Sequence, residues 1–496
     1  MSTPKPSYEE LAALVVELTA HLQQARAQVA ALEVEVAELR ARLGRDSTNS
    51  STPPSADSLA AKGKRRAARS QRVRSKDRKR GGQPGRQGSG LTPTRDPDRT
   101  ERVAALRSCA GCGSGLCDTD LAGYTWGQVW DIPPVVWEKI HYVLPKRRCS
   151  CCGRLNTPSP PFGQAGAVVY GPRVNAAAIL LGWQGNVPVE ATAQVMDALL
   201  DAPVSTGFVA HAQQRLADIL DDAGFDEAMK QALRAEPVLG ADESPVNIVS
   251  NIDADGEPAT GSPHMVTVRT PDERLVWYAA VTSRGSASLK DLGVFDGWDG
   301  VLVRDDYAGY HQFDEHLGGV QQCCAHLLRH LAWVAELDAD NKLWADQVAT
   351  ALRDAAKLVG QATTGEAVDV DKLADARWRY DEGVKVGISF NLSRPWPKGN
   401  HPGLVLARRL QTKADQVWLF TDDLRVPWTN NASEQAIRGP KRHQKISGYW
   451  QSTLTLARYC RVRSYLVSAR NHGLHAIDAI HTALAGTPWL PTPATA

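Results

Sequence analysis

The 496-residue chain lacks the features of membrane-spanning, secreted and disulfide-linked proteins. No apolar run reaches the ~18 residues that a membrane-spanning helix needs. The N-terminus carries Glu9 and Glu10 before its first apolar stretch, where a secretory signal would have basic residues. The chain has nine cysteines, and six of them fall within residues 109–152. In a chain of this length, such clustering favours a metal site in a reducing compartment over a disulfide framework.

Positive charge is concentrated in one short block, although the net charge is only +2. Residues 62–80 hold eleven Lys or Arg against the single acid Asp77, a net charge of +10 that leaves −8 for the remainder. Such a block indicates contact with the phosphates of a nucleic acid. Alternatively, it is a solvated tail without a partner. The DNA-binding candidates within it are Lys64, Arg65, Arg66, Arg69, Arg72, Arg74, Arg78, Lys79 and Arg80.

Residues 8–44 are predicted to form one long helix that serves oligomerisation. Ten positions at alternating steps of four and three residues are all apolar: Leu11, Val15, Leu18, Leu22, Ala25, Val29, Leu32, Val36, Leu39 and Leu43. A heptad seam of this length predicts a coiled coil that joins two or more copies of the chain. The alternative is a helix packed against the protein's own body. The basic, Pro/Gly/Ser-rich residues 45–104 predict a linker.

Residues 105–157 are predicted to form a zinc-binding module. Two C-x-x-C pairs supply four candidate ligands: Cys109, Cys112, Cys149 and Cys152. Four thiolates on two tight turns suit tetrahedral, structural Zn²⁺. The apolar segment 130–143 predicts a strand pair that brings the two turns together. Cys117 and Cys151 are left over, and Cys151 could replace Cys149 as a ligand. The alternative is a group of reduced surface cysteines.

The rest of the chain predicts an α/β fold. Residues 158–236 are mainly helical in pattern and would form a connecting or DNA-binding region. Short β-rich runs follow at Val238–Ala241, Met265–Arg269, Leu275–Val281 and Val301–Arg304. Helical periodicity returns over residues 320–390 and 431–487, so that residues 237–487 would make one catalytic domain.

Three acidic residues stand where a metal-dependent nuclease would need them. Asp242 and Asp305 each end an apolar strand, and Glu434 lies at the start of a helix. Because side chains alternate along a strand, only one acid of Asp242 and Glu243, and one of Asp305 and its neighbour, can face a shared site. Two Mg²⁺ ions, or Mn²⁺ in their place, would need carboxylate oxygens from several elements. One ion would activate water or a 3′-OH, and the other would stabilise the leaving oxygen.

Each acid also has a structural interpretation. An Asp after a strand is often a turn former. Glu434 lies three residues after Asn431, a spacing that suits a capping box, and four before Arg438, a spacing that suits a surface ion pair. Together, however, the order of strand and acid, strand and acid, helix and acid matches an RNase H-like active site.

Several motifs resemble those of the insertion sequence 66 family of bacterial transposases. They are residues 425–438 (RVPWTNNASEQAIR), 444–448 (QKISG), 305–310 (DDYAGY), 323–329 (CCAHLLR), 240–246 (GADESPV) and 461–466 (RVRSYL). The N-terminal order is also similar: a zipper-like helix, an NSS-x-PP linker at 49–54, a GGQPG stretch at 81–85 and a zinc-finger module. The resemblance covers about residues 8–487. Two positions depart from the family pattern, namely Thr429 and His330.

The resemblance implies a DDE transposase with an RNase H-like core and the triad Asp242, Asp305 and Glu434. The 129 residues from Asp305 to Glu434 exceed what a bare core needs, so residues 331–420 are interpreted as a helical insertion. The expected reaction is metal-dependent cleavage and transfer of double-stranded DNA at the ends of an insertion sequence. The expected setting is the bacterial cytoplasm, at the nucleoid, with accessory proteins of the same element as further candidate partners.

Further residues are candidates for supporting roles. Cys323 and His326 form a C-x-x-H element that could orient the site or contact flanking DNA, or else pack the helix. His326 and His330 are spaced as a metal pair would be, but no third ligand is evident. The remaining supporting candidates near Glu434 are Asn430, Asn431 and Arg438, and the candidates for binding phosphates there are Lys441, Arg442 and Lys445.

Two other functions compete with the transposase interpretation. The first is a non-catalytic, zinc-containing DNA-binding protein, either a regulator or an inactive transposase derivative, which would not need Asp242, Asp305 and Glu434 together. The second is an RNA-guided nuclease, in which the zinc ribbon comes late and the acids run D, E, D. Here the cysteine region comes first and the acids run D, D, E, an order that argues against the second alternative.

Overall fold

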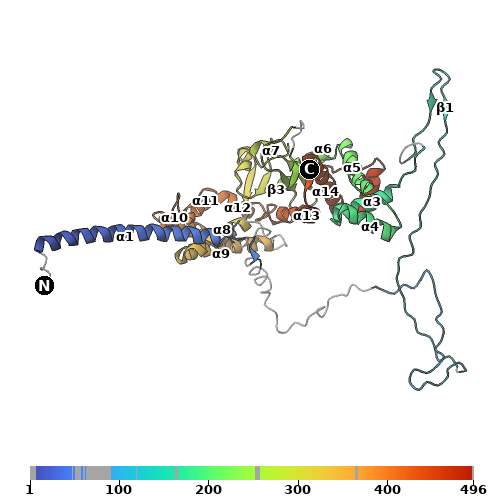
Figure 1. Ribbon diagram of the computed structural model, residues 1–496, viewed down its shortest axis with the longest axis horizontal. Helices are drawn as coiled ribbons and strands as arrows, with labels where there is room; N and C mark the ends of the chain where they lie inside the picture. Colours follow the sequence, from blue (N-terminus) through green and yellow to red (C-terminus); the bar gives the residue numbers. More distant parts are fainter. Residues whose placement is uncertain are drawn as a thin grey trace, which may run out of the picture. The chain divides into compact units, whose positions relative to one another are not determined.

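The computed structural model describes residues 7–46, 49–50, 57–59, 62, 91–118, 120–161, 166–251, 257–362 and 367–493 (Figure 1). The chain divides into two compact units. The larger contains residues 1–65 and 142–496, and the smaller contains residues 66–141. In the described part of the chain, no helix is long and apolar enough to cross a membrane.

Helix α1 (Tyr8–Leu43) occupies almost all of the span in which a helix is predicted. A capping box starts it: the Glu10 N–H donates to Ser7 Oγ, and the Ser7 N–H donates to Glu10 Oε2. Gly44 ends it. The large apolar residues of the predicted seam are 42% to 87% exposed. The helix is therefore confirmed, and its pairing as a coiled coil stays a prediction.

The strand pair predicted within residues 130–143 is wrong. The described residues 120–146 contain no strand. Most of the apolar side chains in this segment are exposed, including Ile132 at 85% and Val136 at 87%. A two-stranded ladder is marginal without a packed apolar face, and this segment has none.

Helices fill residues 172–234, ahead of the sheet. They are α3 (Pro172–Ile179), the π-helical turn η1 (Leu180–Gln184), α4 (Val189–Leu200), α5 (Thr206–Asp222) and α6 (Phe225–Arg234). Pro172 suits the start of α3, where its missing N–H removes no helical bond. Ser205 caps α5 by accepting a hydrogen bond from the Phe208 N–H.

A five-stranded mixed sheet forms the centre of the larger unit. Its strands are β3 (Val238–Pro245), β5 (His264–Arg269), β6 (Val276–Val281), β7 (Val301–Arg304) and β8 (Gly319–Gln322). The spatial order is β6-β5-β3-β7-β8. β3, β5 and β6 are antiparallel neighbours, whereas β7 and β8 run parallel to β3. All four predicted β-rich runs are strands, and β8 was not predicted.

Helices cover both edges of this sheet. At the β6 edge, the N–H groups of Val276 and Tyr278 donate to Ser468 and Ser464 Oγ of α14 (Thr453–Asn471). At the β8 edge, the buried Gln321 side chain bonds to the backbone of α12 (Ala414–Asp422). Both edges are thereby closed to pairing with another chain.

A helical layer separates β8 from the last part of the domain. It contains α8 (Cys324–Leu337), α9 (Ala339–Ala362), α10 (Val370–Asn391), α11 (Pro402–Thr412) and α12. Its buried core includes Trp344, Tyr380 and Trp418, and extends to Val303 of β7. The four helices α9–α12 thus interrupt the chain between the strands and α13, and they lie together in Figure 1.

After this layer, α13 (Asn431–Ser447) returns the chain to β3. A short parallel pair then joins β4 (Ile248–Ser250) to β9 (Trp450–Ser452). The remaining elements are the short helices α7 (Ser286–Lys290) and η2 (Ala308–Phe313), and α15 (Ala476–Leu484). The β4–β9 pair links the segment after β3 to the segment after α13, so that it fixes both relative to each other.

Candidate active site

Two neighbouring central strands bring Asp242 and Asp305 to the same end of the sheet, towards the carboxyl ends of β3 and β7. β3 and β7 are parallel, and Gly240 pairs with Val303. Asp242 and Asp305 each lie two residues further along, so the register puts them at corresponding positions of adjacent strands. The Asp305 carboxylate is held in place by the Tyr307 N–H, which donates to Oδ1 at 3.0 Å.

Glu434 lies in the first turn of α13, which approaches the same end of the sheet. Gly240 allows the helix to approach, because a Cβ there would lie 2.9 Å from Ser433 Oγ and 3.0 Å from Asn430 Oδ1. The Asn430 side chain donates to the Ala241 carbonyl at 2.6 Å. β3 and α13 therefore touch at residues directly adjacent to Asp242 and close to Glu434.

The pKa of Asp242 depends on its burial and on the charges of the neighbouring acids. Burial raises the pKa of Asp242 well above its ordinary value, and the negative charges of Glu243, Asp305 and Glu434 raise it further. The three predicted triad carboxylates therefore lie close enough to repel one another. Hard oxygen donors from separate elements are the ligands that Mg²⁺ or Mn²⁺ prefers, and a divalent charge would relieve the repulsion. The residue types present therefore suit such ions, although among the described residues the group with metal-ligand spacing is Cys323, His326 and Glu434.

The neighbouring acids face other partners. Glu243 Oε1 accepts from Arg284 Nε at 2.7 Å, and Glu243 Oε2 accepts from the Tyr310 hydroxyl at 2.9 Å. Asp306 pairs with Lys413 and lies 3.6 Å from Arg409 Nη1. Glu243 and Asp306 are thus each held by cations of their own, as strand alternation leads one to expect, but Glu243 still lies close enough to Asp242 and Asp305 to interact with both.

Arg284 is a residue of the site that sequence reasoning missed. Besides pairing with Glu243, its Nη2 lies 4.0 Å from Asp305 Oδ2, and its guanidinium carbon lies 3.5 Å from the centre of the Tyr307 ring. Arg284 therefore contacts both Glu243 of β3 and Asp305, which follows β7. No sequence signal marks it, because Arg284 stands in a turn before α7 and belongs to no motif.

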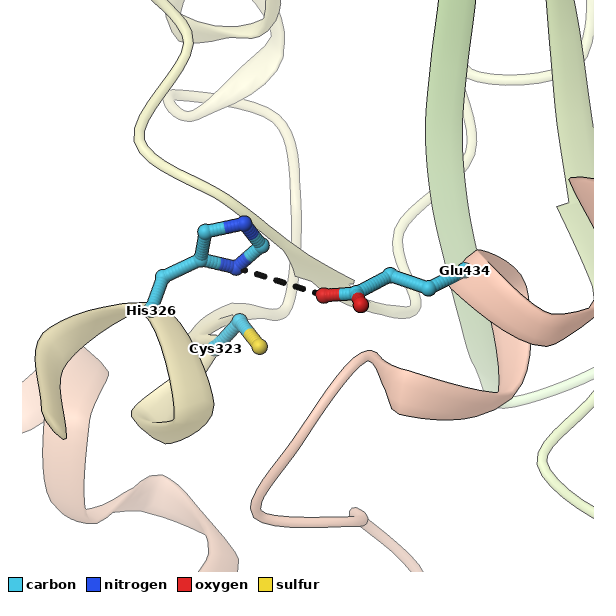
Figure 2. A group of neighbouring side chains, drawn as sticks. All are labelled: Cys323, His326 and Glu434. Carbon is cyan, nitrogen blue, oxygen red and sulfur yellow. Dashed lines mark ion pairs between the residues drawn. The ribbon is translucent and has the colours of Figure 1, made fainter. Parts of the chain in front are cut away.

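Helix α8 holds Glu434 from the other side (Figure 2). Arg329 Nη2 lies 2.9 Å from Glu434 Oε1, and His326 Nδ1 lies 3.7 Å from the same atom. Cys323 Sγ accepts a hydrogen bond from the Asn430 N–H at 3.1 Å. The C-x-x-H element therefore contacts both the carboxylate and the turn before α13. Arg329 ends the motif at 323–329, but sequence reasoning gave it no role.

Ligand atoms of Cys323, His326 and Glu434 all lie within 4.8 Å of one another, a spacing that a metal ion could bridge. The state of the thiol favours a positioning role instead. Burial raises the pKa of Cys323 to about 11, so the thiol is neutral and a poor metal ligand. His330 does not join the group, because its Nδ1 accepts a hydrogen bond from Arg409 Nη2 at 2.8 Å.

Helix α13 also carries Lys441 towards the acids. Burial lowers the pKa of Lys441, while the negative charges of Asp242 and Glu434 act to raise it. Seven residues separate Lys441 from Glu434, which is two helical turns and hence the same face. The other predicted residues of this helix, namely Asn431, Arg438, Arg442 and Lys445, are exposed.

The two structural interpretations of Glu434 do not hold. The capping box with Asn431 is absent, since Asn430 is the N-cap residue and no side chain caps α13. The ion pair with Arg438 is replaced by the pair with Arg329. Glu434 is therefore turned towards α8 and not along its own helix.

The two C-x-x-C turns have the same local geometry. In the smaller unit, the Cys109 N–H donates to the Ser114 carbonyl and the Gly113 N–H donates to the Cys109 carbonyl, each at 2.8 Å. In the larger unit, the Cys149 N–H donates to Arg154 at 2.8 Å and the Gly153 N–H donates to Cys149 at 3.0 Å. β1 and β2, at 147–148 and 155–156, flank this second turn.

The glycines and thiols of these turns suit zinc. Gly113 and Gly153 have φ of +76° and +72°, values that disfavour a side chain. The Ser114 hydroxyl lowers the pKa of Cys112 to about 7, and backbone hydrogen bonds within its own turn lower the pKa of Cys149. A lowered pKa favours the thiolate that Zn²⁺ binds.

The basic block lies outside the described residues except for Lys62. The structure therefore gives no placement for the predicted DNA-binding residues Lys64, Arg65, Arg66, Arg69, Arg72, Arg74, Arg78, Lys79 and Arg80.

Comparison with known protein families gives three matches. Residues 167–456 match the family described as "Transposase IS66 family". Residues 107–153 match the "zinc-finger binding domain of transposase IS66". Residues 2–92 match a family of unknown function, DUF6444. No curated protein matches the chain.

Proposed function

The chain belongs to the IS66 family of transposases, and from this premise we propose that it is a DDE transposase that cleaves and transfers DNA strands at the ends of a bacterial insertion sequence. The observation that carries this proposal is the convergence of Asp242, Asp305 and Glu434 at one end of the central strands, where burial raises the pKa of Asp242 and the negative charges of Glu243, Asp305 and Glu434 raise it further. Buried like charges of this kind are characteristic of functional sites.

The strand order supports an RNase H-like core. Three antiparallel strands are followed by two strands parallel to the first, and β3, the first strand, lies at the centre of the sheet. The first acid lies on this central strand, the second ends its parallel neighbour, and the third lies on a helix that packs on the central strand. The helical insertion is α9–α12, between β8 and α13.

Asp242, Asp305 and Glu434 would hold two Mg²⁺ or Mn²⁺ ions, which when bound supply an activated water or 3′-OH and stabilise the leaving oxygen. The chain's own groups fix the geometry. Arg329 and His326 orient Glu434, and Arg284 steadies Asp305 through Tyr307. In this proposal Lys441 contacts the phosphate oxygens beside the acids, while Arg442 and Lys445 bind phosphates further along the strand.

The N-terminal modules would recognise and pair the element ends. The exposed seam of α1 would join two copies, so that one assembly holds two ends. Cys109, Cys112, Cys149 and Cys152 would bind one structural Zn²⁺, which the matching turn geometries support. The basic block would contribute affinity for DNA phosphates without sequence specificity.

Nicking and strand transfer on a labelled duplex of the element end would test the proposal. Asp305→Asn and Glu434→Gln are expected to lower activity by about 10²–10³-fold or more in Mg²⁺ while retaining DNA binding. Asp306→Asn is the matched control, since it removes the adjacent carboxylate that faces away from the cluster. If the wild-type protein binds the duplex but never cuts it in Mg²⁺ or Mn²⁺, with accessory proteins added, a non-catalytic DNA-binding protein is the correct description.

A further inference from the structure

A second polar site lies on the opposite side of α13 from Glu434. A pocket of about 240 Å³ is lined there by Ala432, Gln435 and Ala436, together with residues of the β5–β6 turn and of α14. At 100° per residue, these three positions form one face of the helix, and Glu434 lies on the other. The pocket is therefore separate from the carboxylate cluster but shares a helix with it.

Three arginines line this pocket: Arg269, Arg463 and Arg470. Arg269 is 3% exposed and pairs with the lining residue Glu273, Nη1 to Oε1, at 3.1 Å. Neither of the other two arginines forms an ion pair with any residue in the described ranges. Three cations against one carboxylate leave the lining with excess positive charge, and such an excess favours an anionic ligand.

Arg463 is half-buried in the wall of the pocket. Its Nε has no hydrogen-bond partner among the described residues. Its guanidinium carbon lies 5.7 Å from the centre of the Tyr278 ring, and it occupies space that a Cβ at Gly439 would need. Tyr278 and Tyr459 stabilise its charge, and no carboxylate of the described ranges pairs with it. A guanidinium without a carboxylate partner leaves positive charge for an anionic ligand.

The pocket is small. Drug-sized ligands and nucleotides occupy cavities of roughly 300–1,000 Å³. A volume of about 240 Å³ suits one phosphate group with part of its sugar. Arginine guanidinium groups recognise phosphate oxygens through paired hydrogen bonds.

We propose that this pocket binds a single backbone phosphate of the DNA strand that passes the active-site helix. The inference rests on the proposed function, since it assumes a DNA substrate. The ligand is bound on one face of α13 while the acids act from the other, so the pocket sets the position of the strand relative to Glu434. Arg470 is exposed and completes the site from the solvent side.

Phosphate-ethylation interference with the full-length protein on an element-end duplex would test this site. In the wild type, ethylation of one phosphate near the cleavage site is expected to block binding. In Arg470→Gln that single interference is expected to disappear, affinity to fall about 5–20-fold, and the slope of log K against log salt to flatten by about 0.9. Arg353→Gln, an exposed arginine of α9 outside the pocket, is the matched control and should keep both the interference and the slope.

The outcomes separate this inference from the proposed function. If wild type and Arg470→Gln give the same interference pattern and slope, the pocket does not bind the strand. If inorganic phosphate raises the melting temperature of the wild type but not of Arg470→Gln, and DNA binding is equal, the pocket takes a free anion instead. If the wild type binds no duplex at all, the proposed function itself fails.

Discussion

At Gly240, the absence of a side chain sets how closely α13 approaches β3. We predict that Gly240→Ala moves α13, and with it Glu434, away from Asp242, because the new Cβ would lie 2.9 Å from Ser433 Oγ. A displacement of about 1 Å at a reacting centre can cost about 10²-fold in rate. Single-turnover cleavage of a pre-nicked duplex would measure the loss, with DNA affinity expected to stay within about twofold.

Gly360→Ala provides the control for this substitution, since a Cβ at Gly360, within α9, meets nothing within 4 Å. It should leave the cleavage rate unchanged and not destabilise the helix. Equal rates for Gly240→Ala and wild type would show that the approach of α13 does not position the acids.

Asp242 is predicted to destabilise the fold in the absence of metal. Its pKa is raised above 3.8 in the folded state, so as pH rises above 4 the unfolded chain loses this proton first and the free energy of unfolding falls. Asp242→Asn removes that term. Its melting temperature at pH 7 without metal should exceed that of the wild type, by roughly 2–4 °C per kcal/mol gained, and the gain should vanish near pH 4.

The melting temperatures of the wild type and Asp242→Asn should also be compared in Mg²⁺, where the order is expected to change. Mg²⁺ should raise the melting temperature of the wild type and leave Asp242→Asn nearly unchanged, since bound ions stabilise only the state that binds them. An Asp242→Asn protein that melts below the wild type at pH 7 in EDTA would contradict the prediction.

Sequence reasoning could predict the acids of this site but not the residues that hold them. Asp305 follows β7 and Glu434 lies in the first turn of α13, as the sequence pattern predicts, whereas β3 continues past Asp242 to Pro245. Arg329 and Arg284 meet their partners across 105 and 41 residues. Arg329 ends the motif at 323–329, but the motif does not name its partner, and nothing local marks Arg284. Their roles depend on which elements the fold brings together.

At the scale of single elements, α1 carries an apolar seam that the described chain leaves exposed. We predict that the wild type is an oligomer joined through this seam and that replacing Leu22 and Leu32 by Glu makes it a monomer, because each charge would be buried in the proposed coiled-coil interface. Light scattering after size-exclusion chromatography would measure the mass. Gln24→Glu and Gln28→Glu, off the seam, should leave the mass unchanged; a wild-type monomer at micromolar concentration would refute the coiled coil.

The C-x-x-C turns predict one bound zinc ion per chain. Cys112→Ser and Cys152→Ser should each reduce zinc, measured by elemental analysis, from about one equivalent to well below half, since each removes one of four ligands. Cys117→Ser is the control and should retain the metal. Full zinc in Cys149→Ser but not in Cys151→Ser would identify Cys151 as the true ligand.

Whether a segment forms a strand or a helix was easier to predict from the sequence than which segments pack or pair with one another. The four β-rich runs became strands because β-branched residues fill buried positions in them. β8 (GVQQ) was missed because its glutamines are polar yet buried, with Gln321 bonded to α12 and Gln322 to Gln416. Segment 130–143 has strand-like composition but no partner surface, so composition alone misled.

For the whole molecule, buried neutral histidines predict loss of stability in mild acid. Burial lowers the pKa of His330 to about 3, and those of His401 and His443 to about 4. Between pH 6.5 and 4 these side chains take up protons only when the chain unfolds, which lowers the free energy of unfolding by about 1.4 kcal/mol per pH unit for each proton. Asp242 acts in the opposite direction, but with a single proton.

Urea unfolding monitored by tryptophan fluorescence at pH 7.5, 6.5, 5.5 and 4.5 would measure this effect. The midpoint should fall steadily below pH 6.5, and His330→Gln should fall less steeply. A midpoint that is constant over this range would mean that the histidines are protonated in the folded protein.

The order of elements along the chain was predictable, whereas the way in which they close on one another was not. A 129-residue gap between Asp305 and Glu434 pointed to an insertion, and helices α9–α12 occupy it. That β4 pairs with β9 across the whole insertion has no sequence signal, because three-residue strands are too short to show periodicity.

The late return of α13 and β9 has a consequence for protein synthesis. Ile248 emerges from the ribosome long before its partner Trp450, and at 5–20 residues per second the interval is roughly 10–40 s. For most of that interval the nascent chain carries helix α1 and the cysteine turns without Glu434. If the proposed function is correct, a message cut short before residue 431 would yield proteins that occupy DNA ends and cannot cut them, which would limit the element's own spread.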